Sequence, residues 1–235
     1  MTTTKTVMRP TDSNECVIAH FLAAPTGIPR RNVLRQCAKD ARAGHIIECG
    51  VRGGNTINLI AEAVPTRTVH GFDSFEGLPA AWDRSRGESY AVGEYSVNGT
   101  PPPVQSNVVL YKGMFADTLP EWAKQHPGPI ALLHVDCDIY SSTRDVLEAL
   151  NAQLVHGTMI VFDELIGGPK YVYWYAHEWR ALNEWRVKYA RSFRVLYRYG
   201  DQAVIRIHGV LNNGATPSCA AAEEGSSNNA TDGQQ

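Results

Sequence analysis

The sequence lacks the features that would tie it to a membrane, a disulfide framework or nucleic acid. Its five cysteines are widely spaced and include no Cys-x-x-Cys pair, which argues against a zinc site or a redox dithiol. No apolar run approaches the roughly 18 residues of a membrane span, and residues 1–10 lack the apolar stretch of a signal peptide. A net charge of -2 gives no basic excess for nucleic acid. We therefore expect a cytoplasmic protein that acts on a small molecule, without nucleic acid or membrane as a partner; homo-oligomerisation stays open.

The length and composition favour one domain with a large core. The chain has 235 residues, of which 43% are hydrophobic and 20% are charged, as in ordinary globular proteins. We expect a partly helical N-terminal segment over residues 1–31, the main domain over 32–210 and a tail over 211–235. The tail is rich in Asn, Ser, Gly, Ala and Thr and has almost no large apolar residues, so we expect it to be disordered.

Short β-branched runs alternate with segments of helical periodicity along the main domain. Strands are predicted at residues 45–49, 68–72, 108–111, 130–135 and 158–162, and helices at 56–63, 119–125, 142–154 and 173–189. The last part differs, because 193–199 and 203–207 have the pattern of two strands joined by a tight turn. This predicts an α/β fold, a Rossmann-like, doubly wound, mostly parallel sheet ending in an antiparallel β-hairpin, which resembles class I methyltransferases.

A glycine-rich turn follows the first predicted strand. Gly50, Gly53 and Gly54 allow the backbone to turn sharply or to approach a ligand closely, although many α/β turns need glycine for geometry alone. The spacing is not Gly-x-Gly-x-x-Gly, which disfavours a nicotinamide cofactor held by its pyrophosphate. A carboxylate at Glu48 suits a cofactor without phosphate, and S-adenosylmethionine has none.

An acidic residue ends the second predicted strand. Asp73 follows Glu48 by 25 residues, near the position at which α/β folds bind the ribose hydroxyls of a nucleoside. A turn or helix-cap role is the alternative. The glycine turn upstream favours ribose binding.

Four segments, in the same order, resemble the macrocin O-methyltransferase family: residues 48–56, 72–79, 112–120 and 134–143. The strings Asp-Ser-Phe-Glu-Gly-Leu-Pro and Asp-Thr-Leu-Pro are unusual, and the resemblance covers roughly half the chain. It implies S-adenosylmethionine as the cofactor and methyl transfer to hydroxyls, in several members the sugar hydroxyls of natural products. It also places Gly113, Met114 and Phe115 near the adenine. The residues expected to bind the cofactor are Glu48, Gly50, Gly53, Asn55, Thr56, Asp73, Ser74, Gly113, Met114, Phe115 and Asp136.

Carboxylates follow the fourth and fifth predicted strands. Asp136 and Asp138 come after one, and Asp163 and Glu164 after the other; the carboxyl ends of such strands face one crevice. Close carboxylates repel each other unless a hard cation such as magnesium neutralises them. The spacing of Asp136 and Asp163 resembles the metal-binding acids of macrocin-type and catechol O-methyltransferases. We expect Asp136, Asp163 and Glu164 to bind Mg2+, with helix capping as the alternative; Glu164 departs from the Asp more usual in the macrocin family.

The general base is less well defined by the sequence. We predict catalytic roles for Asp136, at the metal, and for His177, whose ordinary pKa suits proton transfer; Asp138 and Tyr140 are alternatives, and His177 could instead be structural. Residues 80–105 are rich in Gly, Pro and Tyr, and we expect a long loop that acts as a substrate lid. The aromatic residues within 171–185 predict either an acceptor wall or core packing.

Together these patterns predict an S-adenosylmethionine-dependent methyltransferase that uses a metal to methylate a hydroxyl of a small molecule, such as a sugar or a natural product. A metal would hold two neighbouring substrate oxygens and lower the pKa of one hydroxyl. Two alternatives stay open: a metal-free N- or C-methyltransferase, and a non-catalytic cofactor-binding protein of the same fold.

Overall fold

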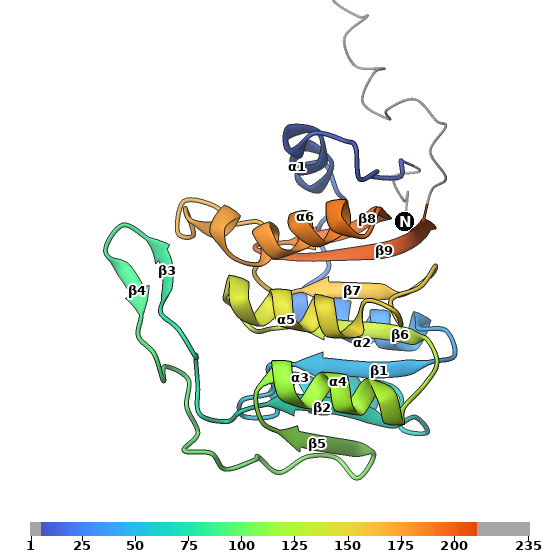
Figure 1. The fold of residues 1–235 in the computed structure, drawn as a ribbon, viewed down its shortest axis with the longest axis vertical. Coiled ribbons are helices and arrows are strands. Elements are labelled where there is room, and N and C mark those ends of the chain that lie inside the picture. The colour runs from blue at the N-terminus through green and yellow to red at the C-terminus, as the bar shows by residue number, and fades with distance from the viewer. Residues whose placement is uncertain (1–5, 211–235) are drawn as a thin grey trace, which may run out of the picture.

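The computed structural model describes residues 6–210, and its centre is a seven-stranded sheet (Figure 1). In order across the sheet the strands are β5 (Val108–Lys112), β2 (Val69–Asp73), β1 (His45–Cys49), β6 (Ile130–Val135), β7 (Met159–Phe162), β9 (Gln202–Val210) and β8 (Arg191–Tyr199). The first five are parallel, whereas β9 runs antiparallel between β7 and the edge strand β8. The predicted doubly wound sheet ending in an antiparallel hairpin is confirmed.

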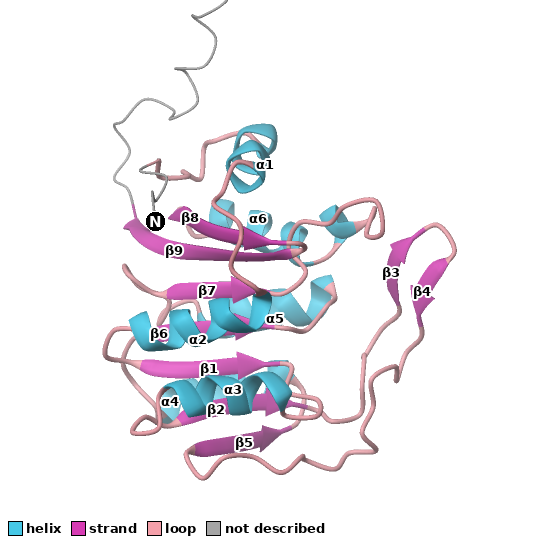
Figure 2. Cartoon of the chain, turned by 180° about the vertical axis from the view of Figure 1, so that it is seen from behind, coloured by secondary structure: helices cyan, strands magenta, loops and turns pink. Residues whose placement is uncertain are grey.

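Helices cover both faces of the sheet (Figures 1 and 2). They are α1 (Asn14–Leu22), α2 (Arg30–Asp40), α3 (Asn55–Ala63), α4 (Phe115–Gln125), α5 (Tyr140–Leu150) and α6 (Glu178–Lys188). The core on one face takes its helical side chains from α1, α4, α5 and α6, and the core on the other from α2 and α3. Among residues 6–210, none of the helices is long and apolar enough to cross a bilayer.

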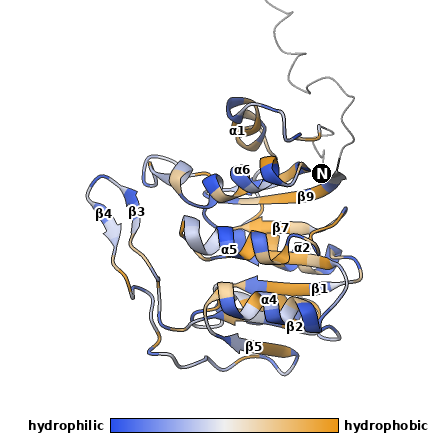
Figure 3. Cartoon of the chain, in the orientation of Figure 1, coloured by the Kyte–Doolittle hydropathy of each residue, from blue (hydrophilic) through white to orange (hydrophobic). Residues whose placement is uncertain are grey.

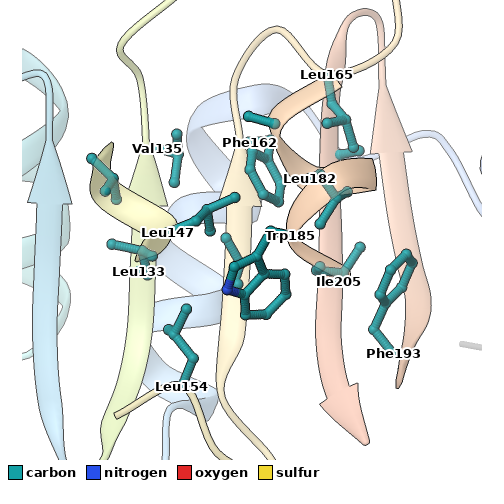
Figure 4. Packing of buried hydrophobic residues seen from close by; sticks show 14 of the residues in the cluster. Leu133, Val135, Leu147, Leu154, Phe162, Leu165, Leu182, Trp185, Phe193 and Ile205 are labelled. Carbon is teal, nitrogen blue, oxygen red and sulfur yellow. The ribbon is translucent and has the colours of Figure 1, made fainter. Parts of the chain in front are cut away.

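The central strands are apolar because both of their faces are covered. Every residue of β6 and β7 is buried, and the hydropathy colouring shows the apolar character of β7 (Figure 3). On the α5–α6 face, Trp185 lies among Leu147, Phe162 and Ile205 (Figure 4). Full burial of one such aliphatic side chain contributes about 1.5–3 kcal/mol, so this packing holds the carboxyl ends of the strands in fixed relative positions.

The N-terminal segment packs on the sheet. The backbones of Met8 and Phe193 exchange two hydrogen bonds of 2.6 and 3.0 Å, and Val17 and Phe21 of α1 are buried in the core. The predicted boundary after residue 31 falls inside α2. The prediction for the tail, residues 211–235, lies outside the described residues.

Two local expectations are wrong. The long loop predicted over residues 80–105 contains a β-hairpin, β3 (Trp82–Ser85) and β4 (Glu88–Tyr90), which extends away from the main sheet (Figure 1). The helix predicted over 173–189 begins later, because His177 has a non-helical backbone (φ -113°, ψ -119°). A 3-10 turn over Trp174–Ala176 precedes it.

Candidate active site

A cavity of about 440 Å³ lies at the carboxyl ends of β1, β2, β6 and β7, where open α/β sheets bind their ligands. The glycine turn after β1 and the segment after β5 line one part of it. The acidic residues after β6 and β7 line another part, and the β3–β4 hairpin and the start of α2 complete it. This volume is in the range of small-molecule sites.

The glycine turn passes very close to the loop after β6. Gly50 has a φ of +97°, and a Cβ added there would lie 1.7 Å from the carbonyl oxygen of Asp136, so only glycine fits. Gly53 has open space where a Cβ would stand, and it lines the cavity. Gly50 therefore meets a backbone requirement, whereas Gly53 leaves room on the cavity side.

Asp73 fixes this turn at the end of β2. Its Oδ2 accepts hydrogen bonds from the backbone N–H groups of Val51 (2.8 Å) and Arg52 (2.7 Å). Its Oδ1 accepts one from Phe75 (2.7 Å). A carboxylate oxygen has more than one lone pair, and Asp73 lines the cavity, so it can also accept hydrogen bonds from ribose hydroxyls.

Glu48 lies beneath the cavity and does not line it. This fully buried side chain accepts a hydrogen bond from Thr56 Oγ1 (2.9 Å), and its Oε2 lies 2.9 Å from His134 Nδ1. On the other side of the ring, His134 Nε2 lies 3.3 Å from Asp163 Oδ1. Burial alone would lower the pKa of His134, but the charge of Asp163 and the contacts to Asp163 and Glu48 outweigh it and raise that pKa well above its ordinary value. A hydrogen-bonded Glu48–His134–Asp163 chain therefore supports the cavity floor, and burial raises the pKa of Glu48 within it.

The acidic residues after β6 and β7 converge. Oxygens of Asp136, Asp138 and Glu164 all lie within 4.8 Å of one another, as do ligand atoms of His134, Asp136 and Asp163. Removal from water, followed by repulsion from Asp163, raises the pKa of Asp138 to about 7 and that of Glu164 to about 8. The pKa of Asp136 is raised well above its ordinary value by the same two causes.

Arg30, at the start of α2, contacts two of these acids. Its Nη2 donates to Asp163 Oδ2 and to Glu164 Oε1, the latter at 2.8 Å. Burial opposes charge on Asp163, yet His134 and Arg30 outweigh it and hold the pKa of that carboxyl far below its ordinary value. Asp163 also accepts a hydrogen bond from Gln202 Nε2 (2.5 Å), so it has more protein partners than Asp136, Asp138 or Glu164.

The β3–β4 hairpin is held by polar and aromatic contacts. Arg84 of β3 pairs with Asp201 at 3.4 Å, and its guanidinium carbon lies 4.7 Å from the ring centre of Trp82 and 4.8 Å from that of Tyr171. His177 contacts the same hairpin, with Nε2 3.0 Å from the carbonyl oxygen of Asp83. These contacts fix the hairpin against the segment before α6.

The structure brings most of the predicted site residues to one cavity. Those that line it are Gly50, Gly53, Asn55, Thr56, Asp73, Ser74, Gly113, Met114, Phe115, Asp136, Asp163 and Glu164. Two do not: Glu48 lies below the floor, and His177 lies outside the wall. Burial also lowers the pKa of His177, and its role as a general base stays a prediction.

The sequence did not reveal four cavity residues, Arg30, Trp82, Arg84 and Tyr95. Arg30 lies in the N-terminal segment, far in sequence from the acids that it pairs with. Trp82, Arg84 and Tyr95 lie in the stretch predicted as a lid without assigned roles. Of the expected aromatic wall over 171–185, Trp179 and Trp185 belong to the core. Trp82, Tyr95 and Phe115 provide the aromatic part of the cavity.

Comparisons with known proteins agree with this geometry. A family model described as macrocin-O-methyltransferase matches residues 24–99 and 102–186. An 8-demethyl-8-(2,3-dimethoxy-alpha-L-rhamnosyl)-tetracenomycin-C 4'-O-methyltransferase from Streptomyces olivaceus is 30% identical over 170 residues, 63% of each chain. Demethyldecarbamoylnovobiocin O-methyltransferase from Streptomyces niveus is 33% identical over 169 residues, 61% of this chain and 62% of the relative.

These matches span less than two thirds of the relatives' lengths. Among solved structures, a calicheamicin methyltransferase superposes with a TM-score of 0.58 at 24% identity, covering 82% of this chain and 80% of that one. The likeness to this structure shows the fold. The family model covers more than half of the chain, and the chain belongs to the macrocin O-methyltransferase family of class I S-adenosylmethionine-dependent methyltransferases.

Proposed function

We propose that the protein transfers the methyl group of S-adenosylmethionine to a hydroxyl of a small molecule, such as a sugar or another natural product. The observation that carries the proposal is one cavity that joins the Asp73-held glycine turn to the carboxylates Asp136, Asp138 and Glu164. The first feature suits a nucleoside without phosphate. The second suits the acceptance of a hydroxyl proton. The relatives named above are O-methyltransferases by name.

The cofactor side fits the nucleoside of S-adenosylmethionine. Asp73 lines the cavity with lone pairs available for ribose hydroxyls. Met114 lines it too and is 44% exposed, so its flexible thioether offers an apolar surface for a flat ring. Gly53 leaves the space between these groups open, since a Cβ there would meet nothing within 4 Å.

The donor set also fits a magnesium ion. Of the three predicted ligands, Asp136 and Glu164 would hold it, because hard cations prefer carboxylate oxygens. Asp163, the third, is already bonded to Arg30 and Gln202. Glu164 Oε2 is buried without a hydrogen-bond partner among the described residues, so one oxygen is available to a cation. When bound, such a cation lowers the pKa of a coordinated hydroxyl and orients it.

Asp138 is the residue best suited to accept the proton when no cation is bound to its carboxylate. It lines the cavity, and its pKa of about 7 matches the working range of a general base. Its φ of +62° is uncommon for a residue other than glycine and is often found at functional sites. As the acceptor oxygen bonds to the methyl carbon, the C–S bond breaks, the hydroxyl proton passes to Asp138, and S-adenosylhomocysteine leaves.

A metal-free reaction is the second candidate, and Arg30 favours it. The guanidinium of Arg30 contacts both Asp163 and Glu164 and supplies one positive charge, so part of the acidic cluster is already balanced without a metal. In this form of the proposal, Asp136 and Asp138 orient the acceptor by hydrogen bonds alone, and the acceptor atom could also be nitrogen or carbon.

The test is an assay of the purified protein with S-adenosylmethionine and a panel of sugar and phenolic acceptors, with S-adenosylhomocysteine and the acceptor's gain of one methyl group as readouts. We expect both products together, and neither when the acceptor is omitted. A chelator arm with and without added magnesium separates the two candidates. Failure to bind S-adenosylmethionine in calorimetry would overturn the proposal.

A further inference from the structure

A second cavity of about 180 Å³ lies at the other end of β7 from the active site. Its wall includes Arg194 of β8 and Arg206 and His208 of β9, together with Arg42 and His156 from the turns after α2 and before β7. Arg206 is the register partner of Met159, the first residue of β7, whereas Asp163 follows the last. Figure 2 shows the arrowheads of the parallel strands along one side of the sheet and their starts along the other.

The arginine side chains of this cavity lie close to one another. Arg194 and Arg206 are direct partners across the antiparallel β8–β9 ladder, so their side chains leave the same face of the sheet at adjacent positions. Arg42 reaches the turn below them, because a Cβ at Gly157 would lie 2.7 Å from its Nη1. Like charges directly opposite each other destabilise a sheet unless something neutralises them.

Among residues 6–210, no carboxylate forms an ion pair with these arginines. None of the three guanidinium groups has a carboxylate within ion-pair distance in that range, and no acidic residue lines the cavity. Arg206 Nη2 contacts only the weak acceptor Met159 Sδ at 3.5 Å. Arg194 Nη2 lies 3.4 Å from His208 Nε2.

Two buried nitrogen atoms in the cavity wall have no hydrogen-bond partner within residues 6–210, which favours a negatively charged ligand that accepts hydrogen bonds. Arg194 Nε and His208 Nδ1 are buried atoms without a hydrogen-bond partner among the described residues. Arg194 and Arg206 are half-buried and Arg42 is exposed. A buried arginine nitrogen without an acceptor is costly, and arginine donors match the oxygens of phosphate groups by geometry and charge. The cavity is smaller than the sites that enclose drug-sized ligands, so it suits one tetrahedral group better than a nucleoside.

We propose that the Arg42–Arg194–Arg206 cavity binds a small tetrahedral oxyanion, with phosphate as the ligand class. A phosphate dianion balances most of the charge of the three guanidinium groups, which a single carboxylate does not. It accepts hydrogen bonds from two strands and two turns, so its binding fastens β8 and β9 to the start of β7. This site is separate from the proposed transferase site and does not depend on it.

The test is thermal unfolding and calorimetric titration of the full chain with sodium phosphate, against sodium chloride at equal ionic strength. The proposal predicts a phosphate-specific rise in melting temperature that follows the binding isotherm. In Arg206→Gln and Arg194→Gln, phosphate affinity should fall at least tenfold. In the matched control Arg180→Gln, an exposed arginine of α6, it should stay unchanged.

A second measurement uses phosphate-free protein, where Arg206→Gln should raise the melting temperature because it removes a like-charge pair. Equal phosphate affinity in Arg206→Gln and in the Arg180→Gln control would overturn the proposal, as would the absence of any phosphate-specific stabilisation. Phosphate binding that develops only in a Glu223→Gln/Glu224→Gln variant would also overturn it, because the arginines would then be serving a carboxylate of the chain itself.

Discussion

At the residue scale, Asp73 fixes the shape of the glycine turn, and we propose that it also binds the cofactor. Its two oxygens accept three backbone N–H groups, from Val51, Arg52 and Phe75. Those bonds orient the carboxylate toward the cavity before any ligand arrives. Because the carboxylate is already oriented, little free energy is lost in ordering it when the ligand binds.

Asp73→Ala should therefore weaken the binding of S-adenosylmethionine by about 1–3 kcal/mol, since it leaves ribose hydroxyls unpaired in a closed site. Asp73→Asn, which retains one oxygen acceptor, should lose less. Calorimetric titration of both variants gives the comparison, with circular dichroism to confirm folding. Wild-type affinity in a folded Asp73→Ala protein would remove this residue from the site.

A substitution at Asp136 tests the predicted metal site. Asp136→Asn keeps the size of the side chain and removes one negative charge from the acidic cluster. We expect magnesium affinity and methyl transfer to fall at least tenfold, with cofactor affinity changed little because Asp73 and the glycine turn bind the nucleoside. Chelator should reproduce the loss in the wild type, and added magnesium should restore activity there.

The control is Asp117→Asn, in the first turn of α4 and outside the cavity lining, which should leave metal affinity unchanged. Full activity of the wild type in chelator, with a defined acceptor, would favour the metal-free candidate, in which Arg30 balances the acids.

Several site residues could be predicted from the sequence because they lie at the ends of predicted strands. Asp73 and Asp136 end or follow apolar runs, and parallel strands bring such positions together. Arg30 was not predictable, because its contact with Asp163 spans 133 residues of sequence and no local pattern encodes it. Glu48 was expected at the cofactor, but its contacts with Thr56 and His134 keep it below the cavity.

At the element scale, the β3–β4 hairpin brings the aromatic side chain of Trp82 to the cavity. Its strands form a separate two-stranded sheet, so the hairpin depends on side-chain contacts and on hydrogen bonds to its backbone, such as that from the Tyr173 N–H to the Arg84 carbonyl oxygen (2.9 Å). The rings of Trp82 and Tyr90 stack at 5.4 Å, and Arg84 lies over Trp82 and pairs with Asp201. Arg84 thus connects the hairpin to the turn between β8 and β9.

Arg84→Ala should loosen this lid. A cation–π contact contributes about 0.5–1 kcal/mol and a partly exposed ion pair about 0–1 kcal/mol, so we expect the KM for the acceptor to rise about three- to tenfold. The dissociation constant for S-adenosylmethionine should change little. Limited proteolysis should cut within residues 80–105 sooner than in the wild type. Arg86→Ala, an exposed position in the hairpin turn, serves as the control, and equal effects of the two substitutions would contradict the assignment.

The long elements were predictable from sequence and the short ones were not. The continuous apolar run of β6 and the one-sided apolar face of α5 have clear periods. β3 and β4 span four and three residues, and their Gly, Pro and Tyr surroundings have the composition of a loop. A strand that short gains its stability from tertiary contacts such as Trp82 with Tyr171, which no local pattern contains.

At the scale of the whole molecule, a cluster of rings joins strands and helix at the edge of the sheet opposite the β8–β9 hairpin. His70 of β2 lies 5.1 Å from Trp122, 5.3 Å from His126 and 5.8 Å from His45, between ring centres. Burial, followed by the proximity of His126 and His45, lowers the pKa of His70 to about 4. The folded protein therefore holds this ring neutral at a pH where the unfolded chain would protonate it.

The sign of the pH dependence follows from these two pKa values. Above pH 7 the ring is neutral in both states and contributes no pH dependence. Between about pH 6.5 and pH 4 the ring binds a proton in the unfolded state but not in the native state. The free energy of unfolding therefore falls as the pH falls, by up to about 2 kcal/mol once solvent screening is allowed for.

His70→Phe keeps a ring of similar size without the titrating nitrogen, and it should reduce the loss of melting temperature between pH 7.5 and pH 5. His20→Gln, at a histidine of α1 outside the cluster, should retain the wild-type profile. If His70→Phe lost as much stability as the wild type over that range, the acid sensitivity of the fold would have to come from other groups, the buried Glu48–His134–Asp163 chain first among them.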